Sequence, residues 1–195
     1  MSLTARPART LLAFVLLFAA ARLLQQNGID LALRATVLAD HEWYRLVTGH
    51  LAHTNWTHLG MNAAALLITL LLFPFYGRPA LLACCVLWNA LFISFGLLLL
   101  FPEIAWYVGF SGIAHGLLMT GALLSLREPV ARLLVLLLVA KVGWEFWSGG
   151  GGVSASLIEA PVVYEAHLLG LVAGAIASLP LALLWPDLVQ RRSRA

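Results

Sequence analysis

Six long apolar segments divide the chain, and they decide what it can fold into. An α-helix crosses a hydrocarbon layer about 30 Å thick with about 20 consecutive apolar residues. The chain has 195 residues, of which 62% are hydrophobic and only 11% charged, which excludes an ordinary soluble domain. We therefore predict an all-α membrane protein, a single bundle of six transmembrane helices over residues 1–195. The segments lie at about 10–26, 57–76, 79–100, 109–127, 130–147 and 161–185.

The basic residues are distributed as in a membrane protein whose two termini share one side. Six spans put the termini, the second-to-third loop and the fourth-to-fifth loop on the same side, and an excess of Arg and Lys marks the cytoplasmic side. The net charge of +3 thus indicates topology. We predict cytoplasmic termini, a retained first helix and no nucleic-acid partner. The arginines on that side are Arg6, Arg9, Arg78, Arg127, Arg132, Arg191, Arg192 and Arg194.

Three short polar motifs lie near the starts of the second, fourth and sixth segments. They are His-Leu-Gly-Met-Asn at 58–62, Gly-Phe-Ser-Gly at 109–112 and Ala-His-Leu-Leu-Gly at 166–170. Polar side chains inside a membrane are unfavourable unless they face a cavity or one another, and they usually mark function. Counting about 1.5 Å per residue from the inner helix ends puts all three in the outer third of the bilayer, with Ser111 about 6 Å below the outer surface. Such agreement in depth predicts one shared site.

A serine and a histidine on two helices are the minimum set for nucleophilic acyl transfer. We expect Ser111 to be the nucleophile and His167 the general base that takes its proton. Ser111 lies at a helix start, where free N–H groups favour a developing oxyanion. Asn62 and His58 share a helix face and are candidate oxyanion donors, although contacts between helices would also explain them.

Other residues near Ser111 have positional roles. Gly109, Phe110 and Gly112 flank the serine, and His115 one turn below is expected to pack against or orient His167. A plain core residue or a second base are the alternatives for His115. Small residues at four-residue spacing let membrane helices approach closely, and this spacing occurs on both helices, as Gly112/Gly116 and Gly170/Gly174.

The remaining polar residues predict no further chemistry. His50, His53 and His58 lack a metal-binding spacing, and we expect no metal or organic cofactor. Lys141 and Glu145 are four apart and are expected to form a structural, snorkelling pair. No carboxylate is expected to complete a triad with His167. The glycines at 149–152 end a helix and are either a connector or a gating cap over the site.

The motifs together resemble those of the rhomboid family of intramembrane serine proteases. That family has His-x-x-x-Asn on its second helix, Gly-x-Ser-Gly at the start of its fourth and Ala-His-x-x-Gly-x-x-x-Gly on its sixth. Trp43-Tyr-Arg45 also looks like its Trp-Arg element in the first outer loop. One departure is His115, where active rhomboids commonly carry tyrosine.

His115, the small size and the 45–56 stretch resemble the rhombosortase subgroup. The resemblance implies a bacterial inner-membrane enzyme whose site opens to the periplasm. Its partners would be the lipid bilayer and membrane-anchored proteins with a C-terminal transmembrane tail, cut at a Gly-Gly-type motif. The alternatives are a general rhomboid protease, an inactive rhomboid-like binding protein and a small transporter or channel.

Overall fold

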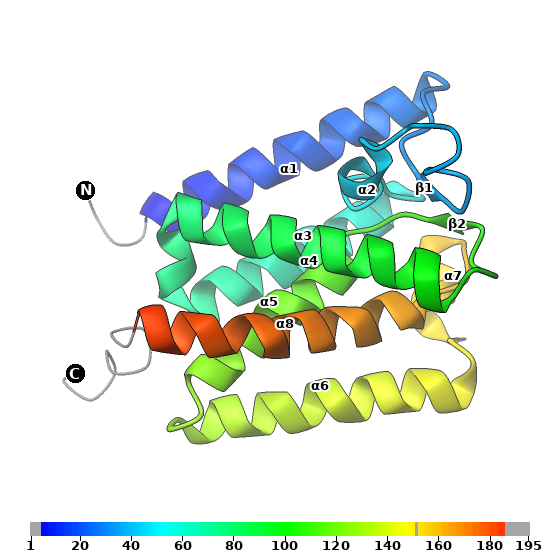
Figure 1. Cartoon of the computed structure of the whole chain (residues 1–195). Helices are drawn as coiled ribbons and strands as arrows, with labels where there is room; N and C mark the ends of the chain where they lie inside the picture. Colours follow the sequence, from blue (N-terminus) through cyan, green and yellow to red (C-terminus); the bar gives the residue numbers. More distant parts are fainter. Residues whose placement is uncertain (1–4, 151, 186–195) are drawn as a thin grey trace.

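The computed structural model describes residues 5–150 and 152–185 as a bundle of long helices with short elements at one end (Figure 1). The described residues form eight α-helices and one 3-10 helix. The six long ones match the six apolar segments. They are α1 (Ala5–Gln26), α3 (Trp56–Leu72), α4 (Pro79–Leu100), α5 (Ser111–Leu124), α6 (Pro129–Ser148) and α8 (Tyr164–Leu184). The short ones are α2 (Arg45–Thr48), α7 (Val153–Ile158) and the 3-10 helix η1 (Pro74–Gly77).

Length and composition make three of these helices candidate membrane spans. They are Pro7–Gln26 of α1, α4 and α8, while α3 and α5 are apolar but shorter. Helix α6 carries Arg132, Lys141 and Glu145 within its apolar sequence. The helical membrane class is therefore supported, and six crossings stay a prediction. Arg191, Arg192 and Arg194, used above for the topology, lie outside the described residues.

Helix ends follow ordinary capping chemistry. Asn55 precedes α3 and its side chain accepts a hydrogen bond from the backbone N–H of His58 at 2.8 Å, which satisfies one free N–H of the first turn. Pro79 and Pro129 occupy the first positions of α4 and α6, where a missing N–H does no harm. Gly149 ends α6 in the left-handed conformation, with φ of +68°, which glycine adopts without a steric cost.

The long loop between α1 and α3 is folded against the helix bundle. Its strand β1 (Leu33–Arg34) pairs antiparallel with β2 (Trp106–Tyr107), with Leu33 opposite Tyr107. Strand β2 precedes α5 in the chain. Buried Arg45 donates to the backbone oxygens of Asp30 at 2.6 Å and Ala32 at 3.1 Å. These contacts hold the loop together, and the two-residue ladder is an addition to the all-α prediction.

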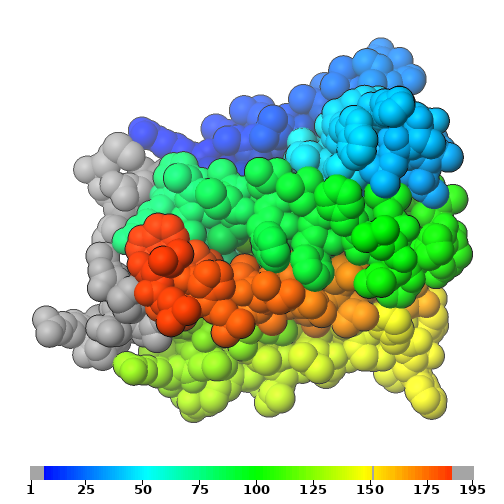
Figure 2. All heavy atoms as spheres, viewed as in Figure 1, coloured from blue at the N-terminus to red at the C-terminus, as the bar shows by residue number. Residues whose placement is uncertain are grey.

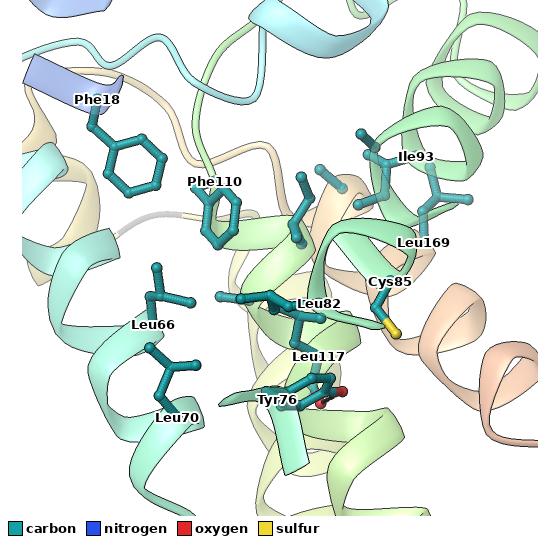
Figure 3. Packing of buried hydrophobic residues seen from close by; sticks show 14 of the residues in the cluster. Phe18, Leu66, Leu70, Tyr76, Leu82, Cys85, Ile93, Phe110, Leu117 and Leu169 are labelled. Atoms are coloured by element: carbon teal, nitrogen blue, oxygen red, sulfur yellow. Dashed lines mark hydrogen bonds between the residues drawn. The ribbon is translucent and has the colours of Figure 1, made fainter. Parts of the chain in front are cut away.

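Helix α5 runs through the centre of the bundle, and its side chains are mostly buried. Figure 3 shows Phe18 of α1 and Phe110, next to Ser111, facing each other above Leu66 and Leu70 of α3. Helix α6 forms one edge of the molecule (Figure 2) and exposes Leu133, Leu136 and Leu137. Apolar side chains on such an outer face suit a lipid environment.

Glycines bring α5 and α8 into backbone contact. A Cβ atom on Gly170 would collide with the carbonyl oxygen of Gly112, and one on Gly174 with that of Gly116. Thr120 reinforces the contact, because its hydroxyl lies 3.0 Å from the carbonyl oxygen of Gly174. The predicted close approach of these two helices is therefore present, and it sets the distance between the residues at their N-terminal ends.

Candidate active site

Ser111 and His167 meet where α5 and α8 begin. Ser111 is the first residue of α5 and His167 lies in the first turn of α8. Serine Oγ is 2.9 Å from Nε2 of His167, a hydrogen-bond distance. His167 is buried, with 5% of its surface exposed. The structure therefore brings together the two residues that the sequence pairs by depth, and their geometry suits proton transfer from the hydroxyl to the imidazole.

A carboxylate lies beside His167, although none is expected there from the sequence. Oε2 of Glu145, in the last turn of α6, is 2.8 Å from Nδ1 of His167. An ionised carboxylate only accepts hydrogen bonds, so Nδ1 carries the ring proton and Nε2 is free to accept from Ser111. The prediction that no carboxylate completes the arrangement is wrong, because the packing of α6 on α8 supplies one.

The expected pair of Lys141 and Glu145 is present, but it is only part of the arrangement. Nζ of Lys141 is 2.6 Å from Oε1 of Glu145, while the other carboxylate oxygen contacts His167. The structural role expected for the pair therefore does not account for all contacts of Glu145.

His115 packs directly against the ring of His167. The two ring centroids are 4.2 Å apart and the planes are inclined by 18°. Nδ1 of His115 donates to the backbone oxygen of Ser111 at 2.7 Å, since a carbonyl oxygen only accepts. Of the three roles considered for His115, packing against His167 is the one that matches this geometry.

Asn62, His58 and Gly109 form the wall beside Ser111. Gly109 has φ of +125°, and a Cβ there would lie 2.8 Å from Nε2 of His58 and 3.8 Å from Nδ2 of Asn62. Glycine is thus required by both the backbone and the space. Nδ2 of Asn62 is buried and has no protein hydrogen-bond partner. A buried donor without a partner is unfavourable.

The ring of His58 is held so that it also presents a donor. The backbone N–H of Thr54 points to Nδ1 of His58 at 3.4 Å, and the Thr54 hydroxyl lies 3.2 Å from the same atom. A backbone N–H only donates, so Nδ1 accepts and the proton of the neutral ring is on Nε2. That nitrogen faces Gly109 and, like the amide of Asn62, can donate a hydrogen bond to an oxyanion.

The loop before Ser111 is fixed by contacts that the motifs do not predict. The N–H of Gly109 donates to the carbonyl of Gly49 at 3.0 Å, and the hydroxyl of Tyr107 donates to the carbonyl of Gly109 at 2.6 Å. Phe110 is fully buried and its ring contacts those of Phe14 and Phe18 on α1. Gly49 and Tyr107 thus position the loop before Ser111. No sequence pattern indicates this role, and only the three-dimensional contacts show it.

His50 and His53, two further histidines near α3, have different surroundings. His50 Nε2 lies 3.0 Å from both the carbonyl of Ala90 and the hydroxyl of Ser94. His53 packs between the rings of Phe18 and His58. Within the described chain no group of three or more His, Cys, Asp or Glu is placed to hold a metal ion.

A small cavity lies over Ser111 and His167. Its volume is about 30 Å³, close to the share of one water molecule in the liquid. The cavity is covered by α7 and the residues 159–163 that follow it. Two hydrogen bonds hold this cover: Thr54 Oγ1 donates to the backbone oxygen of Ile158 at 2.7 Å, and Asn55 Nδ2 donates to that of Leu157 at 3.0 Å. Its lining residues are Thr54, His58, Trp106, Tyr107, Val108, Ser111, Ile158, Ala160, Pro161, Val162, Val163 and His167.

Comparison with known proteins matches this architecture to one family. A family model of the Rhomboid domain matches residues 40–183, which contain all three polar motifs and the loop with Arg45. A search of curated proteins finds no significant match. Because the matched region covers well over half of the chain, the chain belongs to the rhomboid family, whose members are serine intramembrane proteases.

Proposed function

We propose that this protein is an active intramembrane serine protease that uses Ser111 and His167. The observation that carries the proposal is the 2.9 Å contact between serine Oγ and His167 Nε2 across two helices. The stacked His115 and the unpartnered amide of Asn62 support it. An inactive relative would have no need to keep a base, a nucleophile and an open donor together.

The reaction follows from these atoms. His167 Nε2 takes the hydroxyl proton as Oγ of Ser111 forms a bond to the substrate carbonyl carbon. The resulting oxyanion accepts hydrogen bonds from Nδ2 of Asn62, Nε2–H of His58 and the free N–H groups at the start of α5. The imidazolium then gives its proton to the leaving amine, and water or another nucleophile resolves the acyl-enzyme.

The proposed membrane placement has six spans, both termini in the cytoplasm of a bacterial cell and a site open to the periplasm. Helix α5 has 14 residues and is about 21 Å long, shorter than the hydrocarbon layer. If the C-terminal end of α5 lies at the cytoplasmic surface, its N-terminal end with Ser111 lies below the periplasmic surface. In intact spheroplasts, tags at both termini should be protected from added protease, and a tag at Gly150 should be cleaved by it. Accessible termini would contradict the placement.

The proposed substrates are membrane-anchored exported proteins whose C-terminal helix follows a Gly-Gly-type motif. Glycines let the substrate backbone extend, as attack requires. The cavity of about 30 Å³ over Ser111 is too small to hold a substrate segment. A bound peptide needs more space than this, so α7 and residues 159–163 must move aside during binding.

Two reporters that differ only at the cut test the substrate class. One ends in a Gly-Gly motif, an apolar helix and a basic tail, and in the other two leucines replace the glycines. Cells with the wild-type chain should release the first reporter and retain the second in the membrane, and S111A cells should release neither. Equal release of both reporters would contradict the small-residue specificity, and Ser111-independent release would contradict the proposed catalysis.

A further inference from the structure

The geometry points to Glu145 as a positioning residue for His167, so that Ser111, His167 and Glu145 act as one serine–histidine–carboxylate set. This inference rests on the proposed function and deepens it. It gives α6 a role in positioning the base, whereas the sequence motifs lie on α3, α5 and α8 only.

Glu145 is engaged through both oxygens at once. Oε2 lies 2.8 Å from Nδ1 of His167 and Oε1 lies 2.6 Å from Nζ of Lys141. The side chains of His167 and Glu145 are 7% and 13% exposed, whereas that of Lys141 is 47% exposed. The contact with the histidine is therefore the buried one, where a charge–dipole interaction is least screened by solvent.

The position of Glu145 on α6 directs it inward. The buried residues of this helix are Ala131, Leu138 and Val142, and residue 145 continues their spacing of seven, four and three. Glu145 therefore lies on the same face, one turn beyond Val142. The other faces of α6 are exposed and, apart from Arg132 and Lys141, mostly apolar, so the inward-facing carboxylate of Glu145 is an exception among the buried residues of this helix.

The place of Glu145 in the last turn of α6 is electrostatically unfavourable without partners. The C-terminal end of a helix carries a partial negative charge, and a partly buried carboxylate needs compensation. Lys141 supplies part of it, and the imidazolium that forms during the reaction supplies more. Such an arrangement stabilises the charged histidine of the transition state more than the neutral histidine of the resting enzyme.

The end of α6 also fixes the backbone of Glu145. The N–H groups of Gly149 and Gly150 both point to its carbonyl oxygen, the latter at 2.9 Å. Gly150 has no room for a side chain, since a Cβ there would lie 2.5 Å from the ring of Tyr164 on α8. Gly150 therefore lets the end of α6 pack closely against the start of α8, where His167 is located.

The role is one of orientation and charge, with no bond made to Glu145. Its carboxylate accepts the Nδ1–H bond and so keeps Nε2 unprotonated toward Ser111. When the serine proton moves to Nε2, the electron pair of Oγ forms the bond to the substrate carbon and the imidazolium carries the positive charge. Glu145 stays ionised throughout and stabilises that charge.

The experiment compares E145Q, E145D and K141M with the control E165Q, using kcat and KM on the Gly-Gly reporter in proteoliposomes. E165Q removes a carboxylate two residues from His167 on α8 without touching Ser111 or His167. Rates are normalised to folded protein by size-exclusion chromatography. We expect E145Q to lower kcat by about 10- to 1,000-fold with KM within about 2-fold, and E145D to recover part of the loss. K141M removes the more exposed partner of Glu145 and should lower kcat less than E145Q does, while the control E165Q should stay within about 3-fold of wild type.

Three results would overturn the role of Glu145: a wild-type kcat in E145Q, a loss in KM alone, or an equal loss in K141M, which would indicate a structural ion pair. All three presuppose a wild-type enzyme that cleaves in a Ser111-dependent way. If wild-type and S111A proteins behave alike, the proposed function itself fails, so the two failures are distinguishable.

Discussion

His115 stacks on His167 with ring centroids 4.2 Å apart, and the same ring donates a 2.7 Å hydrogen bond to the carbonyl of Ser111. It thus connects the backbone of the nucleophile to the face of the base. This contact limits rotation of the His167 ring, while Glu145 fixes its Nδ1 edge. The imidazole of His167 is therefore held on its face and on its edge before any substrate binds.

Replacing His115 should separate packing from chemistry. H115Y supplies a ring that can stack in the same place, so we expect at least about one tenth of the wild-type activity. H115A removes the stacked face and should lower kcat by about 10- to 100-fold, because a misoriented base loses rate steeply. Initial rates on the Gly-Gly reporter check both. Full activity of H115A would leave His115 without a role at His167.

Asn62→Ala should act on the transition state alone. Its Nδ2 has no partner in the resting enzyme, so its hydrogen bond would form only when the oxyanion develops. Loss of one such donor lowers kcat by about 100- to 1,000-fold, with KM little changed. Michaelis–Menten analysis of N62A, with membrane accumulation as the control for folding, tests this. A purely KM effect would instead assign Asn62 to substrate binding.

Two glycine substitutions form a matched pair. G109A combines a positive φ with a contact of 2.8 Å to His58, so it should abolish activity and lower stability by about 1–2 kcal/mol or more. G60A adds the same methyl group on α3, where nothing lies within 4 Å, and should leave activity unchanged and raise helix stability by up to about 1 kcal/mol. Thermal unfolding and initial rates distinguish the two variants. An active G109A enzyme would contradict the requirement for glycine beside His58.

The loop network around Arg45 should make stability depend on pH in the acid range. The hydrogen bond from Arg45 lowers the pKa of Glu42. Burial alone would raise the pKa of Asp30, but hydrogen bonds from Arg34 and the Ala32 N–H, with the charge of Arg45, outweigh it and leave that pKa lowered. Carboxyl groups whose pKa is lowered by folding stabilise the protein above their unfolded pKa of about 4 and lose this contribution as pH falls further.

Arg45→Lys should weaken that network and its acid dependence together. Lysine cannot reach Asp30, Ala32 and Glu42 at once, so buried carbonyl groups lose partners at a cost of about 1–3 kcal/mol. Unfolding temperatures of both proteins from pH 3 to 7 provide the measurement. The wild-type value should fall more steeply below about pH 4 than that of R45K, and parallel curves would exclude the network as the cause.

The sequence reveals the residues that are polar against an apolar background. Ser111, His167, Asn62 and His58 are detectable because each interrupts an apolar helix at the same depth, and the glycine pairs indicate which two helices touch. Glu145 is missed for a physical reason. Lys141, one turn away on the same helix, can pair with Glu145 locally and so explains the carboxylate without a distant partner. Apolar residues lie on all sides of α6, so hydrophobic periodicity does not reveal which face is inside.

Contacts between segments that are far apart in the chain and involve only a few residues are also not visible in the sequence pattern. The pairing of Leu33 with Tyr107 joins two residues far apart in the chain in a ladder of only two residues per strand, too short for any alternation to be seen. The hydrogen bond from Gly109 to Gly49 likewise depends on how the loop between α1 and α3 folds. These contacts place the serine loop, and only the tertiary structure contains them.

Covalent labelling of Ser111 by a fluorophosphonate or isocoumarin probe in membranes tests the Ser111–His167 mechanism most directly. The wild-type chain should be labelled at Ser111, as located by peptide mass spectrometry, while S111A and H167A should accumulate to the same level without label. Because both residues act on one step, S111A/H167A should cleave no more slowly than either single variant. Absence of label on the folded wild-type protein, or equal labelling of H167A, would contradict a Ser111–His167 protease.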